Sequence, residues 1–227
     1  MRPSHSQQYY DDIIEWDVWN WRKCLPWWLE LCDFTGKKVL TVGERNGGLS
    51  LFFALEGATV FCTDLYGVTD VARKKHERYM VNNRIEYQKA NVLSLPFPNS
   101  TFDIVAFKSV LGSLETKSNQ VLALQEIHRT LKDNGELLFA ENLYATIVHN
   151  LIRSKTVAWG NRWRYIQLQE LPELLSPFRS WCYSSYGAIA LFGRSEKQRF
   201  FLSKVDQALT PILPASWRYI LFAMATK

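Results

Sequence analysis

The sequence lacks any long hydrophobic run: no stretch approaches the roughly 18 apolar residues that span a bilayer. Its first twelve residues are also too polar for the hydrophobic region of a secretory signal. The four cysteines are scattered without a Cys-x-x-Cys pair, so they indicate neither a zinc ribbon nor a disulfide framework and suit a reducing, cytoplasmic setting. The four histidines have no second ligand at metal spacing. We therefore expect no metal site.

A strong charge of one sign is absent as well. The formal net charge is +5, and the basic residues are spread over several segments, which gives slight support to nucleic-acid binding and suits an anionic small substrate equally well. Hydrophobic residues make up 47% of the chain and charged residues 22%, the balance of a globular protein. No repeat, low-complexity tract or linker divides the 227 residues, so one domain is expected.

From residue 37 onwards, short apolar runs alternate with amphipathic stretches of about 12 to 16 residues, which is typical of βαβ units around a parallel sheet. The expected helices cover residues 47–56, 68–82 and 117–131. Gly57 is expected to end the first of these helices, and a turn is expected at residues 132–135. The expected strands cover residues 38–42, 59–63, 85–89, 102–107 and 136–140.

The two ends of the chain differ from this pattern. Residues 12–32 form an aromatic-rich, helical leader that either packs against the core or forms a wall of a substrate pocket. Near the carboxyl end, residues 181–191 and 217–226 are expected as two strands of a terminal hairpin. A helical segment that stops near Pro211 and Pro214 separates them.

The glycine turn between the first strand and the first helix lies where open parallel sheets bind ligands. A dinucleotide site needs Gly-x-Gly-x-x-Gly, and Arg45 at the second glycine position disfavours NAD or FAD. Asp64 follows the second strand, 21 residues after Gly43, where a carboxylate can accept both hydroxyls of a ribose. The alternative is an ordinary aspartate that caps the next element. Because turn, strand and acid occur in register, we expect an adenosine ligand.

These motifs resemble those of the class I S-adenosylmethionine-dependent methyltransferases over residues 36–142. The similar segments are the first motif at 39–48, the second-strand acid at 60–64, the adenine loop at 91–97, the fourth strand at 101–105 and the approach to the fifth at 131–137. The resemblance implies an α/β fold with a seven-stranded, mostly parallel, doubly wound sheet and an antiparallel last strand. The single domain would comprise an N-terminal helical cap (1–35), a cofactor-binding core (36–142) and substrate-side elements with the terminal β-hairpin (143–227).

The resemblance also implies S-adenosylmethionine as the cofactor and S-adenosylhomocysteine as the product. The turn from Gly43 to Gly47 would wrap the methionine end, and Asp64 would hold the ribose. The family commonly has an acid at Thr41, a glycine at Arg45 and an aspartate at Asn91, and Glu44 is the candidate to replace the missing acid near the methionine ammonium. The full set of implied cofactor-binding residues is Gly43, Glu44, Arg45, Gly47, Asp64, Leu65, Asn91, Val92 and Lys108.

Methyl transfer from a sulfonium is an in-line displacement, so the enzyme contributes mainly the positioning of the acceptor. For a hydroxyl acceptor, a general base adds a factor of about 10² to 10⁴. The candidates at the ends of the fourth and fifth strands and shortly after them are His149, Glu141 and Lys108. Each has a structural alternative: helix packing, an ion pair with an arginine and a loop contact, respectively.

The acceptor implied by the resemblance is a small molecule, methylated on an oxygen of a saccharide or other metabolite. After the fifth strand, the aromatic and basic side chains of Trp159, Arg162, Trp163, Arg164 and Tyr165 can stack on a ring and bind a carboxylate or phosphate. We expect an anionic acceptor beneath a lid formed by this segment and the aromatic leader. The alternative is a surface segment whose tryptophans close the core.

Three rival interpretations remain open. Nucleic-acid base methyltransferases often carry Asn/Asp-Pro-Pro-Tyr/Phe after the fourth strand, but residues 108–111 read Lys-Ser-Val-Leu, which disfavours an RNA or DNA substrate. The substitutions at Thr41 and Arg45 allow a non-catalytic binding module. A membrane-surface contact through Phe200, Phe201, Val205 and Leu209, with Arg199 and Lys204 nearby, competes with a short helix packed on the domain.

Overall fold

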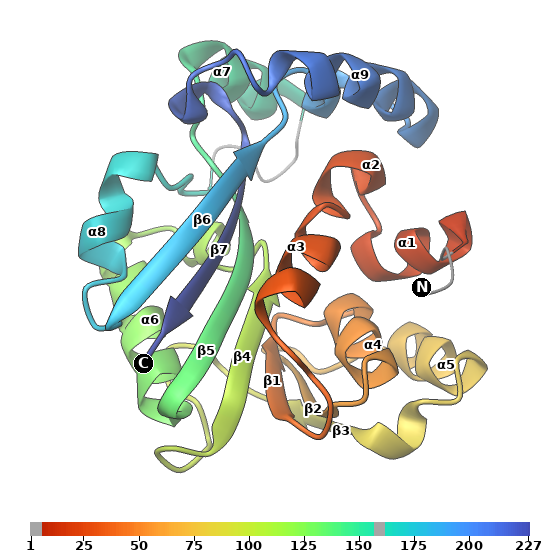
Figure 1. Cartoon of the computed structure of the whole chain (residues 1–227), viewed down its shortest axis with the longest axis vertical. Helices are drawn as coiled ribbons and strands as arrows, with labels where there is room; N and C mark the ends of the chain where they lie inside the picture. The colour runs from red at the N-terminus through yellow and green to blue at the C-terminus, as the bar shows by residue number, and fades with distance from the viewer. Residues whose placement is uncertain (1–5, 157–161) are drawn as a thin grey trace.

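The computed structural model describes residues 6–156 and 162–227, which form one twisted sheet with helices on both faces (Figure 1). The strands pair in the order β3-β2-β1-β4-β5-β7-β6. Strands β1 to β5 are parallel neighbours, and β7 runs antiparallel to both β5 and β6. The predicted mostly parallel sheet with an antiparallel last strand is therefore confirmed. The strands are β1 Lys38–Val42, β2 Thr59–Asp64, β3 Ile85–Lys89, β4 Phe102–Lys108, β5 Leu131–Asn142, β6 Ser180–Tyr186 and β7 Ile220–Thr226.

The helices connect these strands and cover the sheet. The α-helices are α1 Gln7–Ile14, α2 Val18–Trp21, α3 Cys24–Leu31, α4 Gly48–Leu55, α5 Asp70–Arg78, α6 Lys117–Thr130, α7 Ile147–Thr156, α8 Leu171–Leu174 and α9 Glu196–Leu209. Short 3₁₀ turns are η1 Asn82–Arg84, η2 Leu111–Leu114, η3 Leu168–Glu170, η4 Ala190–Phe192 and η5 Ala215–Trp217. Within the described ranges, no helix is long and apolar enough to cross a membrane.

The central strands are buried on both faces, because successive side chains of a strand point to opposite sides. Val39 of β1 joins a core with the helices α1 to α4, and the next residue, Leu40, joins a second core with α6 and α8. Figure 1 shows these two groups of helices on opposite sides of the sheet. The first core is rich in fully buried aromatic side chains: Trp21, Trp28, Phe34, Phe52 and Phe53.

The N-terminal cap packs on the first helix of the parallel unit. A Cβ atom at Gly48 would lie 2.1 Å from the carbonyl oxygen of Ile13, so the end of α1 approaches the first turn of α4 with backbone against backbone. Ile13, Ile14, Trp21 and Trp28 are almost completely buried. These residues of the aromatic leader therefore pack in the core.

Several predicted boundaries are wrong. The helix predicted over 68–82 spans Asp70–Arg78, and the strand predicted over 217–226 begins at Ile220. Residues 132–135 lie within β5, and the expected turn survives only as a left-handed Asn134 beside a register shift between Phe102 and Ile104. The strand predicted over 181–191 ends at Tyr186. Gly187 is left-handed, and the Asp206 carboxylate then accepts hydrogen bonds from the N–H groups of residues 188–190, which bends the chain into η4. A carboxylate from α9, distant in sequence, thus ends the strand.

Candidate active site

The glycine turn has two positions that require glycine. Gly43 and Gly47 have φ angles of 70° and 68°, in the left-handed region. A Cβ atom at Gly43 would lie 2.5 Å from Cγ2 of Val110, and one at Gly47 would lie 2.5 Å from the ring of His76. Arg45 has no left-handed backbone, and its side chain is exposed. The turn therefore accommodates Arg45 without backbone strain.

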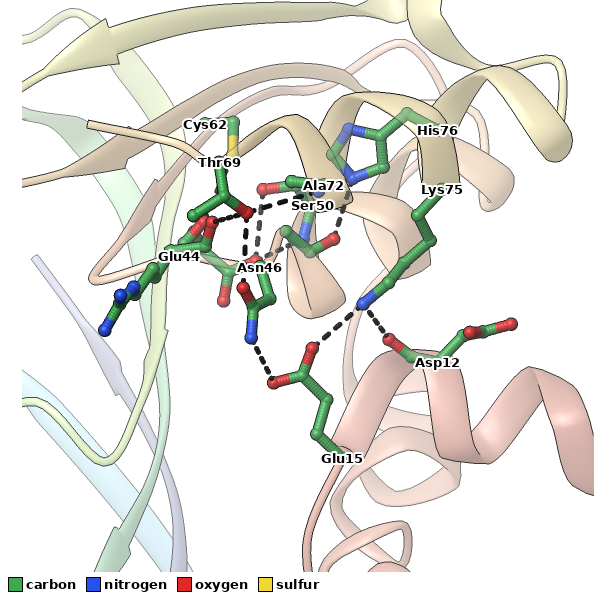
Figure 2. Close-up of polar contacts among 12 residues, drawn as sticks. Asp12, Glu15, Glu44, Asn46, Ser50, Cys62, Thr69, Ala72, Lys75 and His76 are labelled. Carbon is green, nitrogen blue, oxygen red and sulfur yellow. Dashed lines mark hydrogen bonds and ion pairs between the residues drawn. The ribbon is translucent and has the colours of Figure 1, made fainter.

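Helices α1 and α5 hold the turn from outside (Figure 2). Nε2 of His76 donates to the Gly47 carbonyl at 2.8 Å, which leaves Nδ1 to accept from the Tyr87 hydroxyl at 2.9 Å. The buried ammonium of Lys75 donates to the Glu15 carboxylate at 2.9 Å and to the Asp12 carbonyl at 2.7 Å. Glu15 also accepts from Asn46 of the turn at 3.3 Å. The cap, the turn and α5 therefore form one connected unit.

Glu44 lies inside the turn and is buried at 6% exposure. Its Oε2 atom accepts from the backbone N–H of Ser50 at 2.9 Å and from the Ser50 hydroxyl at 3.2 Å, so the carboxylate caps the first turn of α4. Burial raises the pKa of Glu44, while the Ser50 N–H and the charge of Lys108 oppose this rise. Thr41, at the family's usual acid position, is buried and shares a 2.7 Å hydrogen bond with Ser50.

Asp64 ends β2 beside the turn, and Asn91 lies two residues after the end of the neighbouring strand β3. The Glu44 N–H donates to the Thr63 carbonyl at 2.9 Å, which joins the turn directly to the end of β2. The Asp64 carboxylate accepts from the Tyr66 N–H at 2.9 Å, and Leu65 is 51% exposed. Asn91 accepts from the Leu93 N–H at 3.0 Å, and Val92 is buried beneath the same loop. The predicted cofactor residues therefore gather at the carboxyl ends of the strands.

Lys108 ends β4 on the other side of the turn. Its half-buried ammonium lies 5.4 Å from the ring centroid of Trp21 in the cap. No hydrogen bond or ion pair joins the ammonium to another described residue. It therefore supplies a positive charge beside Glu44 that the surrounding side chains leave available.

Glu141 is fully buried at the end of β5 and holds the loop after β4. Its carboxylate accepts from the Leu111 N–H at 2.8 Å and from the Asn142 N–H at 3.0 Å. Burial raises the pKa of Glu141 to about 7, against the opposing effect of backbone N–H donors. The arginine partner suggested as its alternative role is not among the described contacts of this side chain.

His149 lies on the buried face of α7, and both of its ring nitrogens form hydrogen bonds. Nε2 donates to the Ala188 carbonyl at 2.7 Å, since a carbonyl can only accept, and Nδ1 accepts from the Thr146 hydroxyl at 2.7 Å. The ring packs against Phe192 with centroids 5.1 Å apart. Burial lowers the pKa of His149, which favours the neutral imidazole.

Trp163 and Arg164 contact the η2 loop, where the Arg164 N–H donates to the Gly112 carbonyl at 2.9 Å. Trp159 lies outside the described residues. Trp163 covers Gly112, where a Cβ atom would lie 1.6 Å from the indole nitrogen. Arg164 forms an ion pair with Glu170 and donates to Gln120 at 2.5 Å, whereas Arg162 is exposed. Tyr165 lies beneath the guanidinium of Arg153 at 4.2 Å.

Part of the sequence is similar to known methyltransferases. Residues 40–139 match the family model of a methyltransferase domain. The chain is 30% identical to the mitochondrial ubiquinone biosynthesis O-methyltransferase of Schizosaccharomyces pombe over 152 residues, which cover 63% of this chain and 54% of that protein. It is also 30% identical to the ubiquinone/menaquinone biosynthesis C-methyltransferase UbiE of Shewanella frigidimarina over 122 residues, 52% of this chain and 47% of that one.

A solved structure agrees in fold. The Haemonchus contortus phosphoethanolamine N-methyltransferase 2 in complex with S-adenosyl-L-methionine has a TM-score of 0.67 at 16% identity, covering 100% of this chain and 58% of that one. The sequence match therefore covers residues 40–139, and the fold of the chain is that of the class I S-adenosylmethionine-dependent methyltransferases. The whole chain spans about half the length of the curated relatives it matches.

The residues of the matched segment fit S-adenosylmethionine chemically. S-adenosylmethionine carries a ribose diol, an amino-acid ammonium, a carboxylate and a sulfonium. At the carboxyl ends of the strands, Asp64 offers an acceptor for the ribose hydroxyls, Glu44 an anion for the ammonium and Lys108 a cation for the carboxylate. No group of three metal-ligating side chains occurs among residues 6–156 and 162–227.

A cavity of about 330 Å³ lies beyond the end of β5. Leu143, Tyr144, Ile166 and Trp217 contribute to its walls. A second cavity of about 420 Å³ is lined by Lys37, Asp103 and Lys132 at the amino ends of the strands. Ligands of open parallel sheets bind at the carboxyl ends of the strands, which is where the smaller, first cavity lies.

Sequence analysis did not single out Arg153, which lies on α7 and is only 2% exposed. Its Nη1 donates to the Leu143 carbonyl at 2.7 Å, and Nη2 has no hydrogen-bond partner within the described part of the protein. Burial lowers the pKa of Arg153 to about 10. A single arginine in an amphipathic helix is ordinary in a sequence, so no pattern there could have distinguished it.

Proposed function

We propose that this protein transfers a methyl group from S-adenosylmethionine to a small-molecule acceptor. The observation that carries the proposal is the juxtaposition of the glycine turn with the end of β2, where the Glu44 N–H bonds to the Thr63 carbonyl immediately before Asp64. This arrangement occurs inside the segment that matches a methyltransferase domain. When bound, the cofactor supplies a methyl group made electrophilic by the adjacent sulfonium.

In this proposal the chain holds the cofactor through residues at and just after the carboxyl ends of β1, β2, β3 and β4. Asp64 accepts the ribose hydroxyls, and Leu65, Asn91 and Val92 border the adenine. The turn from Gly43 to Gly47, including Arg45, wraps the methionine end. Because both hydrogen bonds to Glu44 involve Oε2, we assign Oε1 to the methionine ammonium. Lys108 pairs with the methionine carboxylate.

For the acceptor we propose an oxygen nucleophile of a saccharide or another metabolite. The relatives are an O-methyltransferase and a C-methyltransferase of ubiquinone biosynthesis, which adds quinone precursors to the classes of acceptor to be tested. Of the three candidate bases, Lys108 is assigned to the cofactor, and Glu141 is assigned to positioning the η2 loop. His149 is the remaining candidate base, and its two hydrogen bonds favour a structural role instead.

An assay of S-adenosylhomocysteine release tests the proposal. Purified protein is incubated with S-adenosylmethionine and separate panels of saccharides, phenols, anionic metabolites and RNA. We expect turnover with one of the small-molecule panels and none with RNA, and Asp64→Ala should lower turnover at limiting cofactor. Binding of S-adenosylmethionine without turnover on any panel would favour the non-catalytic module, and turnover on RNA would contradict the small-molecule assignment.

A further inference from the structure

Helix α9 exposes an apolar stripe that no described part of the chain covers. Phe201 and Val205 are 57% and 44% exposed and lie four residues apart, on the same side of the helix. Ile212, just beyond the helix, is 76% exposed. Lys197 and Lys204 flank this stripe and are also exposed. Phe200, by contrast, is half-buried and packs against Trp19 with ring centroids 4.5 Å apart.

Helix α7 carries a second exposed apolar stripe. Ile147, Val148 and Leu151 are between 56% and 68% exposed, whereas His149 and Arg153 point inward. The helix contains no acidic residue, and Lys155 in its last turn is exposed. A hydrophobic stripe bordered by lysine is typical of helices that lie on a membrane surface.

The two stripes face outward from the same end of the molecule. His149 of α7 bonds to the Ala188 carbonyl, and Asp206 of α9 accepts from the Ala188 N–H at 2.9 Å. Both helices therefore turn their inner faces to the same segment, and their exposed faces point away from it. Figure 1 shows α7 and α9 together at the end of the molecule to which the arrow of β6 points.

The charged residues around these stripes are mostly basic. Residues 143–219 contain ten lysines and arginines but four acids. Asp206 is buried, and Glu196 accepts from the backbone of α2 and pairs with Arg199. The other two acids are paired as well, Glu170 with Arg164 and Glu173 with Lys117. The lysines beside the apolar stripes are therefore not neutralised by neighbouring carboxylates.

We propose that the outer faces of α7 and α9 bind reversibly to the surface of an anionic lipid bilayer. The apolar side chains would enter the boundary between headgroups and acyl chains, and Lys155, Lys197 and Lys204 would contact lipid phosphates. Charge complementarity favours a bilayer over a second copy of the chain, because two copies meeting through this face would bring their lysines together. The exposed Trp217, which also lines the cavity of about 330 Å³, lies just before β7.

Vesicle flotation of the full chain tests the proposal without any methyl acceptor. We expect the protein to float with vesicles of phosphatidylcholine and phosphatidylglycerol in equal parts, to remain unbound with phosphatidylcholine alone, and to dissociate at high salt. The variants Leu151→Ser with Phe201→Ser, and Lys197→Glu with Lys204→Glu, should each weaken the apparent affinity at least tenfold. The matched control is Val71→Ser with Lys74→Glu on α5, where Val71 is 61% exposed.

The outcomes separate membrane binding from the alternatives. Circular dichroism melting identifies any variant that fails to fold, and the affected residues are all on the surface. Absence of binding to anionic vesicles, or an equal loss of binding in the control, would overturn the proposal. A concentration-dependent doubling of mass in light scattering that both α7–α9 variants abolish would assign the face to a second copy. Since flotation needs no cofactor, a failure here leaves the proposed methyl transfer unaffected.

Discussion

At the scale of single residues, burial raises the pKa of Glu141, the carboxylate that positions the η2 loop. It bridges the end of β5 and the η2 loop through backbone N–H groups. Its pKa of about 7 in the folded protein lies above the ordinary 4.5, so the folded state binds more protons between these values. The associated stability is fully present below pH 4.5 and is lost as the pH rises to about 7. The full effect is roughly 3 kcal/mol.

Glu141→Gln should remove this pH dependence, because the amide resembles the protonated acid in shape and does not titrate. Denaturant unfolding of both proteins at several pH values between 4.5 and 7.5 measures the difference in the free energy of unfolding. We expect the advantage of the unmodified protein over the variant to shrink as the pH rises. An advantage that grows with pH would mean that the N–H donors outweigh burial and keep Glu141 ionised.

His149→Ala tests whether the imidazole is a base or a packing group. The variant loses hydrogen bonds to Ala188 and Thr146 and leaves a gap beside Phe192. We expect a lower free energy of unfolding by about 2 to 4 kcal/mol. A turnover at least tenfold lower, with stability and cofactor affinity unchanged, would instead identify His149 as the general base.

Arg162 and Arg164 are both predicted to bind an anionic acceptor, but the two side chains have different surroundings. Arg164 is bound to Glu170 and Gln120, and Arg162 is exposed. We therefore expect Arg164→Gln to lower the melting temperature. For an anionic acceptor, Arg162→Gln should raise the acceptor KM at least tenfold while the affinity for S-adenosylmethionine stays the same. An unchanged KM in both variants would contradict the predicted anion contact.

At the scale of elements, the docking of α1 on α4 positions the cap above the glycine turn. An alanine inside a helix ordinarily stabilises it relative to glycine by about 1 kcal/mol. At Gly48 the added methyl would meet the Ile13 carbonyl at 2.1 Å, so α1 must move. We expect Gly48→Ala to destabilise the protein by about 1 to 3 kcal/mol and to alter the fluorescence of the buried Trp21 and Trp28. An unchanged or higher melting temperature would show that α1 does not pack there.

Sequence reasoning was reliable where a pattern is local. The strands 38–42 and 85–89 are confirmed to the residue, since apolar periodicity and flanking turns define them. Sequence reasoning failed where a side chain from another element determines the backbone conformation. Asp206 of α9, for example, ends β6 after Tyr186. The contacts among Asp12, Glu15 and Lys75 were not predicted for the same reason, because the two helices are about 60 residues apart in the sequence.

At the scale of the whole molecule, three parts of the chain meet at the carboxyl ends of the strands. The glycine turn and Asp64 lie on the cofactor side, the cap closes over Lys108, and α7 and α9 cover the end beyond β5. Polar contacts connect them: Asn20 of α2 donates to Asp206 of α9 and to the Tyr219 hydroxyl, both at 2.7 Å. The parts that would bind the cofactor and the acceptor thus form one packed unit.

The central claim is that Asp64 and the glycine turn bind S-adenosylmethionine, and calorimetric titration tests it most directly. We predict micromolar affinity, about −8 kcal/mol, for S-adenosylmethionine or S-adenosylhomocysteine, and no detectable binding of NADH. Asp64→Ala should weaken the affinity by roughly 1.5 to 3 kcal/mol, because charge-assisted hydrogen bonds to the ribose are lost. Asp70→Ala, which removes an exposed carboxylate from the first turn of α5, should leave it unchanged. Equal affinities for the unmodified protein and Asp64→Ala, or no binding at all, would contradict the assignment.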